Sequence, residues 1–259
     1  MSLAASMSGF WNSAGEPEFK RKKQLMNTGH ALTLFAALLW VRVALVAAEP
    51  GDKGEARQAP IIEDSRLPRV MIIGDSISVG YTDEVRKLLA GKANVYRVAG
   101  NAGPSNSGVQ KLAEWLAPTN GTWNVIHFNF GLHDIKLGTG GKNNQPYATS
   151  DGHQVPLEEY ERNLCRIVAR FKTTGAELIW CSTTPVPAGK LDPPRQPDDV
   201  LKYNMSARNV MTKNDVAIDD LFAVALPRLA DIQLPNNVHF TKQGSAELAK
   251  LSPPASRQH

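Results

Sequence analysis

The sequence has little cysteine, with only Cys165 and Cys181 among its 259 residues. Both lie among apolar neighbours, in a helical and a strand pattern respectively, so we expect two buried free thiols rather than a disulfide or a redox site. The spacing His-x-x-x-His, which is typical of metal sites, does not occur. His127, His133 and Asp134 lie close together in the sequence without that spacing, and we therefore expect no metal ion.

The chain also lacks a basic block of the kind that binds nucleic acids. Its net charge is +4, from 29 Lys and Arg against 25 Asp and Glu. The first 48 residues contain five of the basic and two of the acidic residues, so the net charge of the remainder is about +1. No run of Lys and Arg with interleaved aromatic residues follows, which excludes a nucleic-acid partner.

The amino-terminal segment has the pattern of a secretory signal. A basic cluster at residues 20–30 precedes an apolar run at 31–41, and Val46 and Ala48 fit the −3 and −1 positions of a cleavage site. We interpret residues 1–48 as a signal peptide, which predicts a secreted or periplasmic protein. The alternative is an uncleaved anchor, and only in that case would the protein contact a membrane. Residues 49–68 are polar and unpatterned, and we interpret them as a linker.

Beyond residue 68, apolar runs of strand length alternate with helical periods. Strands that are apolar on both faces and separated by helices indicate a parallel sheet covered on two sides. We therefore predict one catalytic domain at residues 69–259, a three-layer α/β/α sandwich with a mostly parallel five-stranded sheet. The predicted strands are 69–74, 94–99, 124–131, 177–184 and 216–221, and the predicted helices are 81–90, 107–117, 157–174, 198–213 and one from Thr241.

In such a sheet, the loops after the carboxyl ends of the strands form the ligand site. Ser76 follows the first predicted strand, residues 101–107 follow the second, and His133 follows the third. These three segments should therefore lie at one edge of the sheet.

Four segments of the chain resemble conserved blocks of the SGNH (GDSL-like) hydrolase family. They are GDS at 74–76, GNAGPS at 100–105, GLHD at 131–134 and NNVHFTKQG at 236–244. Their order and spacing agree over roughly residues 69–250. The resemblance implies a flavodoxin-like SGNH hydrolase fold and a serine nucleophile in the first block.

The residue types in these blocks suit acyl transfer through serine. A serine hydroxyl is a poor nucleophile at neutral pH and needs a base within hydrogen-bond reach, for which His239 is the candidate. Negative charge on the attacked carbonyl oxygen needs donors already aimed at it. The resemblance implies that the N–H groups of Ser76 and Gly103, together with a side chain of the third block, form this oxyanion hole.

Two residues depart from the family pattern. His133 stands where the family usually has asparagine, and it can still donate one N–H to the oxyanion, although a purely structural role is the alternative. Asn236 stands where the family usually has the aspartate that orients the histidine. Its amide oxygen could hold the tautomer of His239 without stabilising its charge; otherwise the site is a Ser-His dyad. Asp231 is the nearest upstream acid, five residues before Asn236.

The sequence thus predicts an exported serine esterase that needs no cofactor. Export and the polar loops at 137–154 and 185–199 favour a small acyl group, such as O-acetyl, on a carbohydrate or another small ester. In the first loop, Asn143, Tyr147 and His153 are candidate substrate contacts. Two alternatives remain: a non-catalytic carbohydrate-binding protein on the same fold, and an O-acyltransferase, which forms the same acyl-serine.

Overall fold

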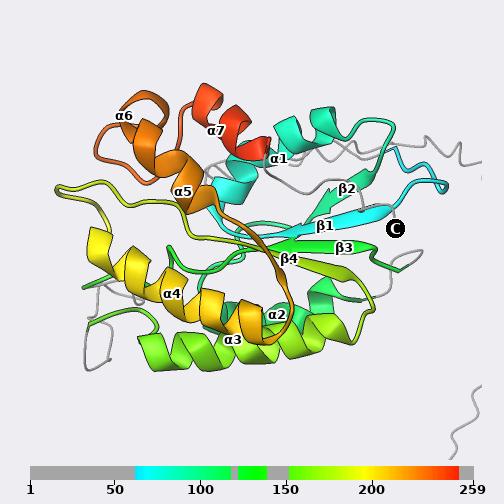
Figure 1. Cartoon of the computed structure of the whole chain (residues 1–259), viewed down its shortest axis with the longest axis horizontal. Helices are drawn as coiled ribbons and strands as arrows, with labels where there is room; N and C mark the ends of the chain where they lie inside the picture. The colour runs from blue at the N-terminus through cyan, green and yellow to red at the C-terminus, as the bar shows by residue number, and fades with distance from the viewer. Residues whose placement is uncertain (1–61, 118–121, 139–151, 251–259) are drawn as a thin grey trace, which may run out of the picture. The chain divides into compact units, whose positions relative to one another are not determined.

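The computed structural model describes residues 62–117, 122–138 and 152–250. The predicted signal peptide and most of the predicted linker lie outside these residues. Within them, five strands form one parallel sheet in the order β2-β1-β3-β4-β5, which confirms the predicted fold class (Figure 1). The strands are β1 (Arg69–Ile73), β2 (Asn94–Arg97), β3 (Val125–Phe128), β4 (Glu177–Cys181) and β5 (Ala217–Asp219).

Helices cover both faces of the sheet (Figure 1). One layer holds α1 (Ser76–Leu88), α5 (Leu221–Ala225) and α7 (Lys242–Ala249), and the other holds α2 (Ser105–Trp115), α3 (Leu157–Lys172) and α4 (Pro197–Lys213). A short connection of η2 (Leu226–Arg228) and α6 (Leu229–Ile232) lies between α5 and α7, where the sequence pattern predicted no helix. No helix in the described ranges is both long and apolar enough to cross a membrane.

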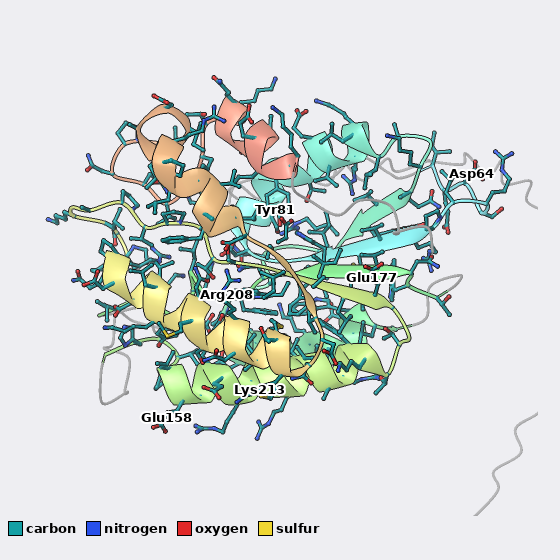
Figure 2. The ribbon with its side chains drawn as sticks, in the orientation of Figure 1. Asp64, Tyr81, Glu158, Glu177, Arg208 and Lys213 are labelled. Atoms are coloured by element: carbon teal, nitrogen blue, oxygen red, sulfur yellow. The ribbon has the colours of Figure 1, made fainter. Side chains whose placement is uncertain are left out.

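The core explains why the strands are apolar on both faces. All five residues of β1 are buried, as are all four of β3, since helices pack above and below them. Tyr81 of α1 points from the helix toward the sheet (Figure 2), and its hydroxyl lies 3.9 Å from the Sγ atom of Cys181. Each fully buried large apolar side chain in such a core stabilises the fold by roughly 1.5–3 kcal/mol.

The two cysteines lie in different environments. Both are free thiols, but Cys181 of β4 is buried while Cys165 of α3 is exposed. The expectation of a buried Cys165 was wrong, because the face of α3 that packs on the sheet is formed by Tyr160, Leu164, Ile167 and Phe171. Cys165 lies outside that stripe, although its sequence neighbours are apolar.

Helix α1 begins five residues earlier than the periodicity predicted. The Oδ1 atom of Asp75 accepts a hydrogen bond from the N–H of Ile77 at 2.9 Å, so Asp75 caps the helix and Ser76 becomes its first residue. The first residues of α1 include Ser76, Ser78 and Gly80, so this part of the helix lacks the apolar periodicity from which a helix is predicted. Gly80 suits a close approach to α7, since a Cβ there would lie 3.1 Å from the Oγ of Ser245.

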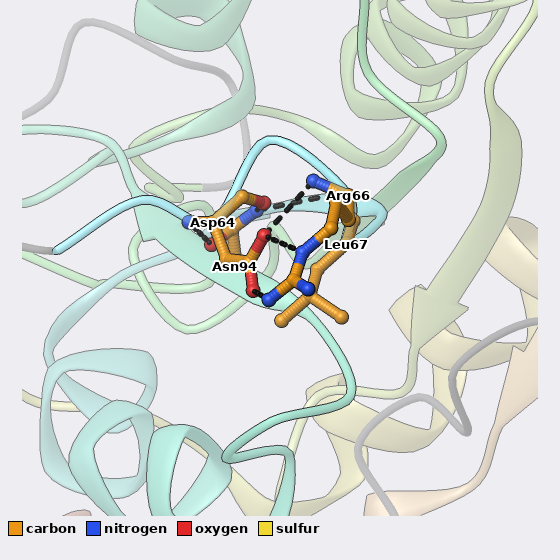
Figure 3. Close-up of polar contacts among 4 residues, drawn as sticks. All are labelled: Asp64, Arg66, Leu67 and Asn94. Carbon is orange, nitrogen blue, oxygen red and sulfur yellow. Dashed lines mark hydrogen bonds and ion pairs between the residues drawn. The ribbon is translucent and has the colours of Figure 1, made fainter.

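The last residues of the predicted linker are bound to the domain. Asn94, at the start of β2, accepts a hydrogen bond from the N–H of Asp64 at 3.0 Å and donates to the carbonyl oxygens of Asp64 and Leu67 (Figure 3). The Arg66 guanidinium donates to both carboxylate oxygens of Asp64, at 2.9 and 2.7 Å. The residues just before β1 are therefore held against the amino end of β2.

Candidate active site

A cavity of about 300 Å³ lies at the carboxyl edge of the sheet. Its walls come from the residues after β1 and β3, from the loop that precedes α4, and from the segment between α6 and α7. Strands β1 and β3 are neighbours, and the chain leaves them toward opposite faces of the sheet. A crevice at such a switch point is where parallel α/β folds bind ligands.

Ser76 lies at the start of α1 because of the cap that precedes it. As the first helical residue, its N–H has no carbonyl partner within the helix and lies at the positive end of the helix dipole. Asp75 itself is buried, and burial raises the pKa of its carboxyl, an effect that the nearby charges of Arg195, His239 and Arg97 oppose. The local structure therefore presents the Ser76 hydroxyl and a helix N-terminus at one wall of the cavity.

Ser76 and His239 meet across the cavity wall. The Nε2 atom of His239 lies 2.8 Å from the Oγ of Ser76, although 163 residues separate them in the sequence. Thr241 caps α7 with its hydroxyl at 3.0 Å from the N–H of Gly244, so the helix starts just after the histidine. A nucleophile and a base within hydrogen-bond distance are what serine catalysis requires.

Asn237, rather than Asn236, contacts the ring of His239. Its Oδ1 lies 2.7 Å from the Nδ1 of His239 and also accepts the backbone N–H of His239 at 3.0 Å. Asn236 is exposed, with a left-handed φ of 51°, and it lines the cavity without a contact to the ring. Asp231 lies exposed on α6. The left-handed backbone of Asn236 turns the chain. The side chain of Asn237, two positions before His239, therefore contacts the ring, and that of Asn236, three positions before it, does not.

These contacts define the tautomer of His239. A backbone N–H only donates, so the Asn237 atom that faces it must be the amide oxygen, an acceptor. The same oxygen lies against Nδ1, which therefore carries the ring hydrogen. Nε2 is left as the acceptor for the Ser76 hydroxyl. This is the tautomer that a general base at Ser76 needs.

Gly103 adopts a left-handed backbone with φ of 72°, and its N–H donates to the Oδ1 of Asn101 at 2.9 Å. Asn101 lines the cavity, whereas Gly103 is not among the lining residues. The structure thus gives the Gly103 N–H a partner within its own loop, where the sequence had predicted a donor aimed at the oxyanion. An Asn side chain two residues earlier can accept a backbone N–H in a local turn, and this contact competes with any other acceptor for that N–H.

Asp134 of the third block connects the segments that follow β2 and β3. Its Oδ1 accepts the N–H of Ser105 at 2.8 Å, and Asn163 of α3 donates to the Ser105 hydroxyl at 3.1 Å. Burial raises the pKa of Asp134 to about 7, against the lowering effect of the hydrogen bonds from Ser105. Asp134 therefore holds the start of α2, and with it the loop of Gly103, to the turn that follows β3.

His133 lines the same cavity as Ser76 and His239. Its Nδ1 lies 2.9 Å from the Nζ of Lys136. Burial lowers the pKa of His133 to about 3, and the positive charges of Lys136 and Arg195 add to this effect, as does His239 when it is protonated. His133 is therefore a neutral ring at any pH at which a serine esterase works.

The proline-rich loop at 185–199 forms one wall of the cavity through Leu191, Asp192, Pro193 and Arg195. Arg195 is buried and donates from Nε to the carbonyl oxygen of Leu132 at 2.7 Å, which ties this loop to the turn of His133. Sequence reasoning did not identify Arg195, Lys136, Asn101 or Asn237 as site residues. Two of them could have been found from their spacing. Lys136 stands three positions after His133 and Asn237 two positions before His239, and each contacts that histidine.

The other predicted loop is only partly described. Asn143 and Tyr147 lie outside the described residues. His153 lies within them, and its Nε2 contacts the Oδ2 of Asp199 at 2.9 Å, away from the cavity lining. His153 therefore connects this loop to α4 and is not a substrate contact in this structure.

Among the described residues, no group of three or more His, Cys, Asp or Glu side chains could hold a metal ion. His127, on β3, is fully buried and its Nε2 lies 3.3 Å from the Oδ2 of Asp219 on β5. That histidine thus contacts another strand of the same sheet and does not line the cavity of His133.

Comparisons with solved structures agree with the fold. The chain is similar to an acetyl xylan esterase, AlAXEase, with a TM-score of 0.55 and 16% identity over 71% of this chain and 96% of the other. It is also similar to a lipase/acylhydrolase from Enterococcus faecalis, with a TM-score of 0.57 and 17% identity over 71% and 93%. A third similar structure is a member of the lipolytic G-D-S-L family from Veillonella parvula. Its TM-score is 0.53 and its identity 15%, over 71% of this chain and 95% of the other. At these identities the likeness shows a shared fold.

A search of curated proteins gave no significant match. The sequence model of the GDSL-like Lipase/Acylhydrolase family, in contrast, matches residues 72–246, which span β1 to α7 and include all four blocks. The chain therefore belongs to the GDSL-like lipase/acylhydrolase family, the SGNH hydrolases.

Proposed function

We propose that this hydrolase is an exported serine esterase that removes a small acyl group, most simply acetyl, from a carbohydrate ester. The observation that carries the proposal is the chain of contacts from Asn237 through His239 to Ser76, at 2.7 and 2.8 Å, beside an open cavity. Such a chain activates a serine for attack on a carbonyl carbon.

The proposed mechanism gives each group a role. His239 Nε2 accepts the proton of Ser76 as its Oγ attacks the ester carbonyl, and the protonated ring then gives that proton to the leaving alcohol. The oxyanion meets the Ser76 N–H and the side chain of His133 at the same cavity. Water, deprotonated by His239, attacks the acyl-serine and releases the acid and the free Ser76 hydroxyl. These steps use only side chains and water.

The size and polarity of the cavity support a small acyl group on a polar alcohol. At about 300 Å³ it is at the small end of ligand sites, and most of its lining side chains are polar or charged. Solved relatives include an acetyl xylan esterase, a protein of the same fold. Export follows from the signal-like pattern at residues 1–48.

The test is hydrolysis of p-nitrophenyl acetate by the protein that starts at Glu49, beside Ser76→Ala and His239→Ala. Each substitution should lower kcat by a thousandfold or more, in the range seen when a triad member is removed. A serine-directed phosphonate should label wild type and not Ser76→Ala. Wild-type protein that neither hydrolyses acetyl esters nor takes up the phosphonate would instead indicate a carbohydrate-binding protein. Transfer of the acetyl group to added sugars in place of water would indicate an acyltransferase.

A further inference from the structure

The turn after β3 brings a lysine against a cavity histidine. The N–H of Lys136 donates to the carbonyl oxygen of His133 at 3.3 Å, so the two residues close one turn of chain and their side chains lie on one side of it. The Nζ of Lys136 lies 2.9 Å from the Nδ1 of His133, and both side chains line the cavity that holds Ser76 and His239.

The chemistry of this contact leaves one arrangement of hydrogens. Burial and the charge of Arg195 lower the pKa of Lys136, whereas the charges of Asp75 and Asp134 raise it. In its ammonium form Lys136 has three donors and no acceptor, so Nδ1 of His133 accepts and the ring hydrogen lies on Nε2. Burial is the main effect that opposes a second proton on the ring, and the charges of Lys136 and Arg195 add to it, as does His239 once it is protonated. Lys136 thus selects one tautomer of His133 and adds to the effect of burial that keeps the ring neutral.

The two cavity histidines therefore have opposite tautomers. Asn237 places the hydrogen of His239 on Nδ1 and leaves Nε2 to accept, whereas Lys136 leaves the hydrogen of His133 on Nε2 to donate. One ring is prepared to take a proton and the other to give a hydrogen bond. Acyl transfer needs both functions, the first at the serine and the second at the oxyanion.

We propose that Lys136 is a positioning residue that holds His133 as a neutral Nε2–H donor to the oxyanion, in the place where the family uses an asparagine amide. The inference rests on the proposed esterase function. An amide side chain always has an N–H to donate, whereas an imidazole needs its tautomer selected. The replacement of asparagine by His133 thus brings a requirement for a second residue, and Lys136 meets it.

A double-mutant cycle in p-nitrophenyl acetate hydrolysis tests the proposal. Lys136→Met should lower kcat about tenfold, less than the roughly hundredfold loss expected when a whole oxyanion donor is removed in His133→Ala. His133→Asn should keep activity within a few fold, and adding Lys136→Met to it should change kcat less than about twofold, because an amide needs no tautomer selection. Lys136→Arg should restore activity, since a guanidinium is also a donor without an acceptor.

Lys213→Met is the matched control for loss of a lysine. Lys213, labelled in Figure 2, is exposed in the last turn of α4. It precedes the amino end of β5, whereas the cavity lies at the carboxyl edge of the sheet. Its substitution should leave kcat unchanged. Equal losses from Lys136→Met in the wild-type and His133→Asn backgrounds would overturn the proposal and indicate that Lys136 binds substrate directly.

A second measurement is independent of catalysis. Nitrogen-15 NMR of the resting wild-type protein should show His133 with a bare Nδ1 and a hydrogen on Nε2, without titration down to about pH 4. In Lys136→Met, His133 should titrate at higher pH. A hydrogen on Nδ1 of His133 in wild type would overturn the inference. Failure of the proposed function would appear separately, as absence of phosphonate labelling at Ser76.

Discussion

The amide oxygen of Asn237 binds His239 twice, through Nδ1 at 2.7 Å and through the backbone N–H at 3.0 Å. One neutral acceptor thus fixes both the backbone and the ring of the proposed base. In the family pattern an aspartate, three residues before the histidine, has this role. Here the role belongs to an asparagine two residues before it, and the contact supplies orientation without a negative charge.

Asn237 is therefore the position at which the charge can be restored. Asn237→Asp should raise kcat several-fold and move the acid limb of the pH–rate profile up by roughly one unit, because a carboxylate stabilises the protonated imidazole. Asn237→Ala should lower kcat by about a hundredfold through loss of the tautomer. Asn236→Asp is the matched control and should have the smaller effect. Assays of p-nitrophenyl acetate hydrolysis against pH measure all three, and a larger gain in Asn236→Asp would assign the orienting role to that residue.

Gly103 offers a test of whether its loop serves catalysis or only folding. A Cβ there meets nothing closer than 3.7 Å, so Gly103→Ala should cost only the strain of a left-handed backbone, about 1–2 kcal/mol of unfolding free energy. Gly91→Ala, at φ of 70° with nothing within 4 Å and at the other edge of the sheet, should cost the same. Only Gly103→Ala should also lower kcat/KM, because the Gly103 N–H holds the side chain of Asn101, which lines the cavity. Urea unfolding and ester hydrolysis give the two readouts, and equal activity in both variants would show that the loop of Gly103 serves folding only.

Asp134 should make stability depend on pH. Its pKa in the folded protein is about 7, above the ordinary value of 3.8, so the folded state holds the proton more tightly. This contribution to stability is full below about pH 4 and is lost as the pH rises through about 7. Asp134→Asn keeps an acceptor for the N–H of Ser105. It should reduce the fall in unfolding free energy between pH 4 and 8 by about 2–4 kcal/mol. Urea unfolding between pH 4 and 8 measures it, with exposed Asp231→Asn as the control; an unchanged slope in Asp134→Asn would contradict the assignment.

Arg195 should support the site through the backbone of the neighbouring turn. Arg195→Met removes the donor to the carbonyl oxygens of Leu132 and Pro193 inside a buried wall, and should cost about 2–3 kcal/mol of unfolding free energy. Because that turn carries His133, kcat should fall as well. Arg208→Met, on the exposed face of α4 (Figure 2), removes an arginine with an exposed ion pair and should cost less than about 1 kcal/mol. Similar losses of unfolding free energy in the two variants would show that the contacts of Arg195 to this turn do not stabilise the site.

The sequence by itself determined the fold class, the parallel sheet and the edge at which the chemistry lies. These follow from patterns that are local, because a strand buried on both faces must be apolar throughout and a loop after a parallel strand must emerge at the carboxyl edge. Ser76 and His239 were identified through the resemblance of their blocks to the family pattern, because neither residue's local pattern points to catalysis by itself.

Only the tertiary structure decided which side chains complete the site. The partner of His239 depends on the left-handed turn at Asn236, and the partner of His133 on a turn that folds Lys136 back by three residues. The N–H of Gly103 lies within hydrogen-bond distance of its own loop rather than open to the cavity. A hydrogen bond is made or lost over a few tenths of an ångström. Such distances arise from the dihedral angles of turns and from packing between distant segments, which residue patterns do not specify.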